Sequence, residues 1–402
     1  MFFGLGFWNK RLVFEVFLKV EDRWELHALW DREEDAIEDG RRLLLSGKTL
    51  SIKVVRLRTL SNGVSSETVV YEQEIQPRKV KPVTIATPQG DVAICGTLDD
   101  LFTVEARRTI SQVMRDYLCR GNICTTELLH SYSHMRKLQD AQGLVNAAMH
   151  RIATAQANEA KVAPKQRIQL LDTLLSQAQA KARTMAADRS AYPAFKGNDL
   201  SALSDLILSR CSLEQHDYVL NSLLTVWLFD FRSLAAKVEA LTLLAQENVE
   251  NGLIRQVDAI LSDMLIFADV VQELFVPQPN LGSALMQMGE VVLRRKGAVE
   301  NVVNPTMRMM AALIVQGDMP HCQAALADRL LRELNGERPL DSRAQDNENA
   351  LLERLVQTLS GEDGTILGGE RTRLSVEKRR LRQREQLLRA HGLHSIADNL
   401  RS

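Results

Sequence analysis

The chain has 402 residues, of which 45% are hydrophobic, and it carries 50 Lys and Arg against 51 Asp and Glu. This length indicates two or three domains, and the hydrophobic content excludes a wholly disordered chain. A formal net charge of −1 excludes a global electrostatic attraction to nucleic acid or to anionic lipid. Binding of either kind would need a local patch.

The cysteines and the apolar runs indicate where the protein functions. Five cysteines are scattered without the spacing of a disulfide framework, which favours a reducing compartment: Cys95, Cys119, Cys124, Cys211 and Cys322. No apolar run approaches the ~20 residues of a membrane-spanning helix. The N-terminus lacks the basic segment that begins a secretory signal. We therefore expect a cytoplasmic protein.

Four aromatic side chains lie within the first eight residues: Phe2, Phe3, Phe7 and Trp8. Aromatic side chains on an N-terminal arm can cover the open face of a small sheet. An exposed arm would instead form an apolar patch for a protein partner or a membrane surface. We retain these four residues as candidates for partner binding.

Two alternating runs predict a β-hairpin. In residues 11–20, Phe14, Val16 and Leu18 share one face of the first strand. In residues 24–30 the alternation predicts one shared face for four residues: Trp24, Leu26, Ala28 and Trp30.

Residues 31–45 predict a helix, since Asp31 and Glu34 have the spacing of a capping box and apolar residues recur on one face. Alternation in residues 51–58 and 67–75 predicts two further strands joined by a turn at Asn62-Gly63. The order β-β-α-β-β describes an antiparallel sheet backed by one helix. Residues 82–95 could add another hairpin, and we assign residues 1–96 to a small α+β domain.

The chain from Thr97 onward is predicted to be helical, with inward faces that are apolar. Two stripes at helical spacing predict two long amphipathic helices, the first capped by Ser212. The first stripe comprises Leu220, Leu223, Leu224, Trp227, Leu228, Phe231 and Leu234; the second comprises Leu253, Val257, Ile260, Leu261, Met264, Leu265, Ala268 and Val271. No repeat period recurs, so we expect a non-repetitive helical bundle.

Residues rich in Pro and Gly predict the loops of the helical part at 188–199, 276–282, 335–349 and 360–370. The first of these loops follows an Ala- and Gln-rich stretch, and we place a domain boundary there. The expected organisation is a helical segment over residues 97–190 and a helical bundle domain over residues 191–402.

Most catalytic and cofactor motifs fail on their spacing. The sequence SGKT at residues 46–49 has Arg42 where a phosphate-binding loop needs glycine, and it follows a helix instead of preceding one. Cys119, Cys124, His130 and His134 have donor types that zinc prefers, but the histidine pair begins only six residues after Cys124, whereas structural zinc sites separate their two ligand pairs by about a dozen residues. On a helix, Cys119 would point away from the other three. We expect no cofactor and retain only Cys124, His130 and His134 as candidates for a metal site.

Residues 371–389 are strongly basic. Leu374, Leu381 and Leu388 recur every seven residues, which predicts a helix that packs its leucines, with Leu387, on the bundle and leaves its arginines in water. The same arginines could instead contact an anionic partner, and four are candidates for partner binding: Arg379, Arg380, Arg382 and Arg384. Nucleic acid is disfavoured because no aromatic or base-reading element accompanies them.

The sequence thus predicts a mainly α protein with a small α+β N-terminal domain. We expect a non-enzymatic, cytoplasmic regulatory or scaffold protein that binds a protein partner through amphipathic helices. Homo-oligomerisation through the helices and peripheral membrane contact stay open. The alternative is a signalling enzyme or a metal-dependent sensor whose site is assembled from residues distant in sequence.

Overall fold

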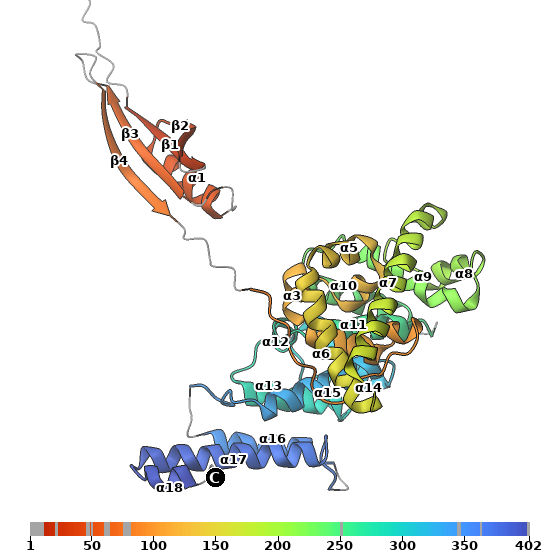
Figure 1. The fold of residues 1–402 in the computed structure, drawn as a ribbon. Helices are drawn as coiled ribbons and strands as arrows, with labels where there is room; N and C mark the ends of the chain where they lie inside the picture. The colour runs from red at the N-terminus through yellow and green to blue at the C-terminus, as the bar shows by residue number, and fades with distance from the viewer. Residues whose placement is uncertain are drawn as a thin grey trace, which may run out of the picture. The chain divides into compact units, whose positions relative to one another are not determined.

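The computed structural model describes residues 12–20, 23–45, 49, 51–59, 65–74, 82–249, 252–343, 347–361 and 364–399. The chain divides into two compact units, Met1–Pro82 and Val83–Ser402. The first unit is an antiparallel sheet with one helix and the second is helical, which confirms the predicted fold class (Figure 1). Phe2, Phe3, Phe7 and Trp8 lie outside the described residues.

The first unit has the predicted β-β-α-β-β order. Its elements are β1 (Leu12–Val20), β2 (Arg23–Trp30), α1 (Glu33–Leu45), β3 (Ser51–Thr59) and β4 (Ser65–Glu74). The strands form an antiparallel sheet in the order β2-β1-β3-β4. Phe14 and Val16 pack against Ala36 and Leu43 of α1. At Gly40 a Cβ atom would lie 2.4 Å from the Ile52 side chain, so glycine permits this close approach of helix and sheet.

A β-bulge corrects the predicted face of β2. Val16 pairs with Ala28, whereas the next residue, Phe17, pairs with Leu26, so His27 is an extra residue on β2. The bulge reverses the alternation, and Trp24 and Leu26 lie on the face opposite to that of Ala28 and Trp30. The sequence showed unbroken alternation because a bulge of one residue leaves no signal in apolar spacing.

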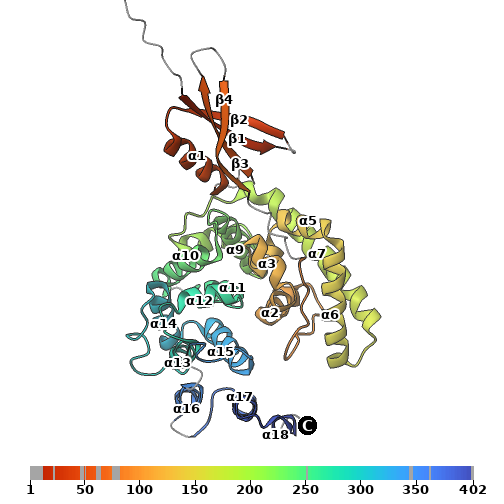
Figure 2. The same ribbon diagram turned by 90° about the vertical axis from the view of Figure 1, so that its left-hand side faces the viewer.

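The second unit is built from α-helices and short 3₁₀ turns (Figure 2). Its elements are η1 (Asp99–Phe102), α2 (Val104–Val113), α3 (Arg115–Gly121), α4 (Thr125–His130), α5 (Tyr132–Asp140), α6 (Gln142–Ala160), α7 (Pro164–Asp188), η2 (Arg189–Ala191), α8 (Leu200–Leu208), α9 (Leu213–Leu228), α10 (Leu234–Glu247), α11 (Ile254–Met264), α12 (Ala268–Leu274), α13 (Leu281–Val292), α14 (Pro305–Gln316), α15 (Pro320–Asn335), α16 (Glu348–Leu359), α17 (Glu370–Ala390) and α18 (His394–Asn399). All four predicted loops of this unit lie between helices, as expected.

The prediction of two long helices from these stripes is wrong. The first stripe is divided between α9 and α10, and the second between α11 and α12. Most of the stripe residues are nevertheless buried in one core, so the apolar spacing identified the inward faces correctly. Ser212 precedes α9, but its side chain makes no capping hydrogen bond.

Residues 82–96 contain no strand, so the prediction of an additional hairpin is also wrong. This extended segment is fastened to the helical unit, where the Ala86 amide donates to the Val113 carbonyl at 3.0 Å and the Gln89 amide to the Gln112 side chain at 3.0 Å. Residues 83–96 therefore belong to the second unit and not to the predicted N-terminal domain. The boundary near residue 190 stays a prediction.

Two buried ion pairs correct the expectation that the inward helix faces are purely apolar. Lys237 of α10 donates to the Glu127 carboxylate of α4 at 2.6 Å. Arg107 of α2 lies 3.4 Å from the Asp263 carboxylate of α11, which also accepts from the Thr126 hydroxyl at 2.6 Å. The side chains in both pairs are at most 3% exposed. These pairs fix the positions of the helices around the site described next.

Candidate functional site

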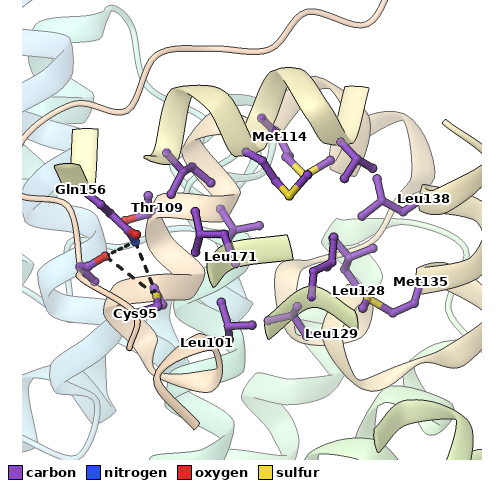
Figure 3. A pocket seen from close by; sticks show the side chains of 18 residues that line it. Cys95, Leu101, Thr109, Met114, Leu128, Leu129, Met135, Leu138, Gln156 and Leu171 are labelled. Atoms are coloured by element: carbon purple, nitrogen blue, oxygen red, sulfur yellow. Dashed lines mark hydrogen bonds between the residues drawn. The ribbon is translucent and has the colours of Figure 1, made fainter. Parts of the chain in front are cut away.

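An apolar cavity of about 80 Å³ lies inside the second unit, among α2, α4, α5, α6, α7 and the segment before η1 (Figure 3). We call it the apolar cavity. Its wall comprises Ala93, Cys95, Leu101, Ala106, Thr109, Ile110, Met114, Leu128, Leu129, Met135, Leu138, Val145, Ala148, Met149, Ile152, Gln156, Leu171 and Leu175. Most of these side chains are buried.

Helical periodicity directs these residues to a common centre. On α6, Val145, Ala148 and Ile152 lie on one face, and α7 contributes Leu171 and Leu175, one turn apart. Ala106 and Ala148 supply only a methyl group where a leucine would fill the space. Small side chains on close helices therefore leave a void that neighbouring leucines do not fill.

Three methionines, Met114, Met135 and Met149, make part of the wall adaptable. A methionine side chain has three rotatable bonds and a polarisable sulfur atom, so it adjusts to groups of different shape. Figure 3 labels Met114 and Met135 among the side chains that line the apolar cavity. These side chains can therefore change rotamer to accommodate a bound group.

One end of the apolar cavity is polar. The Gln156 amide donates to the Ala93 carbonyl at 2.6 Å and to the Cys95 sulfur at 3.7 Å. Behind it, the Arg167 guanidinium donates to the Cys95 carbonyl and to the Gln156 side-chain oxygen, both at 2.6 Å. Cys95, Gln156 and Arg167 are at most 7% exposed, and their hydrogen bonds offset most of the cost of burial.

Cys95 is the one titratable side chain among the residues that line the apolar cavity. Burial raises the pKa of its thiol, and the hydrogen bond from Gln156 opposes that rise only in part. The thiol is therefore protonated near neutral pH, and a protonated thiol is a poor nucleophile. The lining of the apolar cavity is therefore suited to binding an apolar group, and its thiol is not suited to nucleophilic attack.

The three metal candidates are not part of the lining of the apolar cavity. Cys124 is the N-cap residue of α4, and its side chain accepts from the backbone of Glu127. The His130 ring contacts Phe102 and Tyr218, while His134 meets the edge of Phe229. Within the described ranges, no group of three His, Cys, Asp or Glu side chains is placed to share an ion.

Both histidines are held neutral by burial, which lowers the pKa of His130 to about 3 and that of His134 to about 4. The unfolded chain takes up protons below a pKa of about 6.5 and the folded chain does not, so stability falls from that pH downward. We expect His130→Phe to reduce the loss of unfolding free energy between pH 7 and pH 5 by about 2 kcal/mol. Urea titrations at the two pH values measure this, with His150→Phe, an exposed position, as the control.

The four candidate arginines of α17 have different environments. Arg379 is 4% exposed and donates to the carbonyls of Leu334 and Glu333 at 2.6 and 2.8 Å. Arg382 donates to the Gly336 carbonyl at 2.9 Å. Arg380 forms a surface pair with Glu353, and Arg384 is exposed. Arg379 and Arg382 thus cap the end of α15, and only Arg380 and Arg384 project into solvent.

The leucines of α17 also differ from expectation. Leu374, Leu381 and Leu387 are 56%, 39% and 53% exposed, whereas Thr372, Ser375 and Val376 are buried. The predicted leucine contact with the bundle is therefore wrong. The carbonyl groups at the end of α15 need hydrogen-bond donors, and the arginine face supplies them.

Sequence reasoning missed the apolar cavity altogether. Its only signal was the Ala- and Gln-rich composition of residues 139–187, which includes Ala148 and Gln156. Small side chains in a helix are consistent with close packing as well as with a void, so composition does not distinguish them. The two buried ion pairs join residues more than 100 positions apart and had no local signal.

No helix within the described ranges is both long and apolar enough to cross a lipid bilayer. Comparisons of the chain with protein-family models, with curated proteins and with solved structures find no match. The site therefore has to be interpreted from its own geometry.

Proposed function

We propose that this chain is a non-enzymatic regulatory protein of the cytoplasm, which binds a small apolar molecule in the apolar cavity and presents its helices to a protein partner. The observation that carries the proposal is a buried void with an almost wholly hydrocarbon lining. Such voids exclude water and accept apolar molecules of matching size. The protonated Cys95 thiol supports binding over reaction.

The size of the cavity limits the ligand. An engineered apolar cavity of about 150 Å³ in another protein binds benzene, and the cavity here is about 80 Å³. A ligand of benzene size therefore requires the methionines of the wall to move aside. We propose a small hydrocarbon or aromatic molecule, whose one polar group, if present, would lie beside Gln156.

α2 connects the cavity to the rest of the unit. Ala106 and Ile110 line the cavity, while Arg107 between them pairs with Asp263 of α11. A ligand that displaces α2 would act on the buried ion pair and on the helices beyond it. Arg380 and Arg384, together with the exposed Leu381 and Leu387 of α17, are the surface proposed for the partner.

Methyl-¹³C methionine NMR with dissolved benzene tests the proposal. We expect the signals of Met114, Met135 and Met149 to shift, while those of Met288 and Met310, buried elsewhere in the core, stay constant. Ala148→Leu fills the cavity and should abolish the shifts. Ala187→Leu makes the same change at an exposed position of α7 and should leave them intact. Equal shifts in both groups of methionines would refute a defined site.

A further inference from the structure

A second concave site lies at the surface of the helical unit, between α2, α15 and α17. Its volume is about 440 Å³, and we call it the basic groove. Its lining includes Asp91, Arg108, Asp328, Arg332, Arg371 and Lys378. None of these residues lines the apolar cavity, so the two sites are separate.

The basic groove carries more positive than negative charge. Arg108 pairs with Asp328 at 3.0 Å, which neutralises one cation. Arg332, Arg371 and Lys378 make no ion pair with any residue in the described ranges. The single further acid on the lining is Asp91. In a chain of net charge −1, three unpaired cations around one groove are a local excess that the composition did not reveal.

The three unpaired cations face the groove from two helices. Arg371 and Lys378 are seven residues apart on α17, so they lie on one face of that helix. Arg371 belongs to the first turn of α17, where unpaired backbone amides add positive potential. Arg332 comes from α15.

Arg332 is in an unfavourable electrostatic environment. Burial lowers the pKa of its guanidinium, as do the charges of Arg329 and Arg115, whereas Asp328 and Glu333 oppose this shift only in part. A half-buried cation beside two like charges gains free energy when an anion binds. A smaller polar pocket of about 110 Å³ shares Arg108, Asp328 and Arg332 with the groove, and its lining also includes the acids Glu105 and Asp263.

We propose that the basic groove binds a small molecule that carries at least two phosphate groups. Guanidinium groups bind phosphate oxygens in a bidentate manner, and a phosphate group carries more charge than a carboxylate. Two phosphate groups would neutralise Arg332, Arg371 and Lys378 together, whereas a single carboxylate would neutralise one. The volume leaves room for an organic group that carries the phosphates.

Isothermal titration calorimetry with inorganic pyrophosphate, on the full chain at physiological salt, tests this site. We expect the double variant Arg371→Gln, Lys378→Gln to raise the dissociation constant about 100-fold, tenfold for each lost charge. Both positions are exposed, so the variant should fold. Arg332→Gln should raise the constant about tenfold.

The control is Arg384→Gln, which removes an exposed charge from α17 outside the groove. We expect its dissociation constant to stay within twofold of the wild-type value. An equal loss in this variant would show attraction to overall charge and would overturn the site, as would a wild-type chain that gives no saturable binding. Because the methionine NMR experiment concerns another site, either proposal can fail without the other.

Discussion

Replacement of Lys237 by methionine is expected to lower the free energy of unfolding of the helical unit by about 3–5 kcal/mol, the largest effect among the changes considered. The variant leaves the Glu127 carboxylate, whose side chain is 0% exposed, without its cation. Glu127 keeps hydrogen bonds from Cys124, whose amide donates to it at 2.9 Å, but no cation. An unpaired buried charge is costly because neither water nor a counter-ion solvates it.

The pH dependence of this variant has a defined sign. Burial already raises the pKa of Glu127 in the intact protein, against the opposing effect of Lys237. Without Lys237 the pKa rises further, so the folded chain holds a proton that the unfolded chain has lost. Stability is then lost as the pH increases through the folded-state pKa. The loss of unfolding free energy caused by Lys237→Met should therefore be smaller at pH 5 than at pH 8.

Urea unfolding followed by far-UV circular dichroism measures both effects. Lys165→Met, at an exposed position of α7, is the matched control and should change stability by less than about 0.5 kcal/mol. The double variant Glu127→Gln, Lys237→Met should recover much of the loss, because it removes the charge as well as the partner. A Lys237→Met deficit no larger than the control's would show that the pair contributes little.

Replacement of Arg379 by alanine is expected to cost about 3 kcal/mol, the second largest effect. It removes hydrogen bonds to the carbonyls of Leu334 and Glu333 and leaves Glu348, 3.1 Å away, without its cation. Glu348 also accepts from the Leu340 amide, so the change disturbs the join between α15 and α16.

Arg384→Ala is the matched control, since it makes the same substitution at an exposed site on α17. We expect it to change the unfolding free energy by less than about 0.5 kcal/mol. A pull-down with the double variant Arg380→Glu, Arg384→Glu then measures how well the chain retains its partner, without a loss of stability. If Arg379→Ala proved as mild as Arg384→Ala, the capping of α15 would not stabilise the fold.

How far the sequence predicted the fold depends on how local the signals are. The four strands, α1 and the loops of the helical unit were predicted because alternation, capping residues, Pro and Gly are local features. The division of each apolar stripe into two helices was not predicted, because the stripes continue across Phe231 and Ala268 without a change of spacing. A short bend costs little when the residues on both sides are still buried in the same core.

The candidate site was less predictable than the fold. Helix α17 shows why. Its leucines at heptad spacing indicated that they face the bundle. The surface that α17 contacts instead presents carbonyl groups from the end of α15, and Arg379 donates hydrogen bonds to them. Amphipathic spacing describes one helix and carries no information on its neighbour. The apolar cavity likewise depends on the separation of α2, α6 and α7. Alanine at residues 106 and 148 leaves space for the cavity but does not determine that separation.

The most direct test of the account is a crystal structure of the protein exposed to xenon gas, because xenon enters dry apolar voids without hydrogen bonds. We expect a xenon site between Met114, Leu128 and Leu171 in the wild-type protein and none in Ala148→Leu. A wild-type structure without xenon there, or one in which ordered water fills the space, would contradict the claim that this unit holds an apolar ligand.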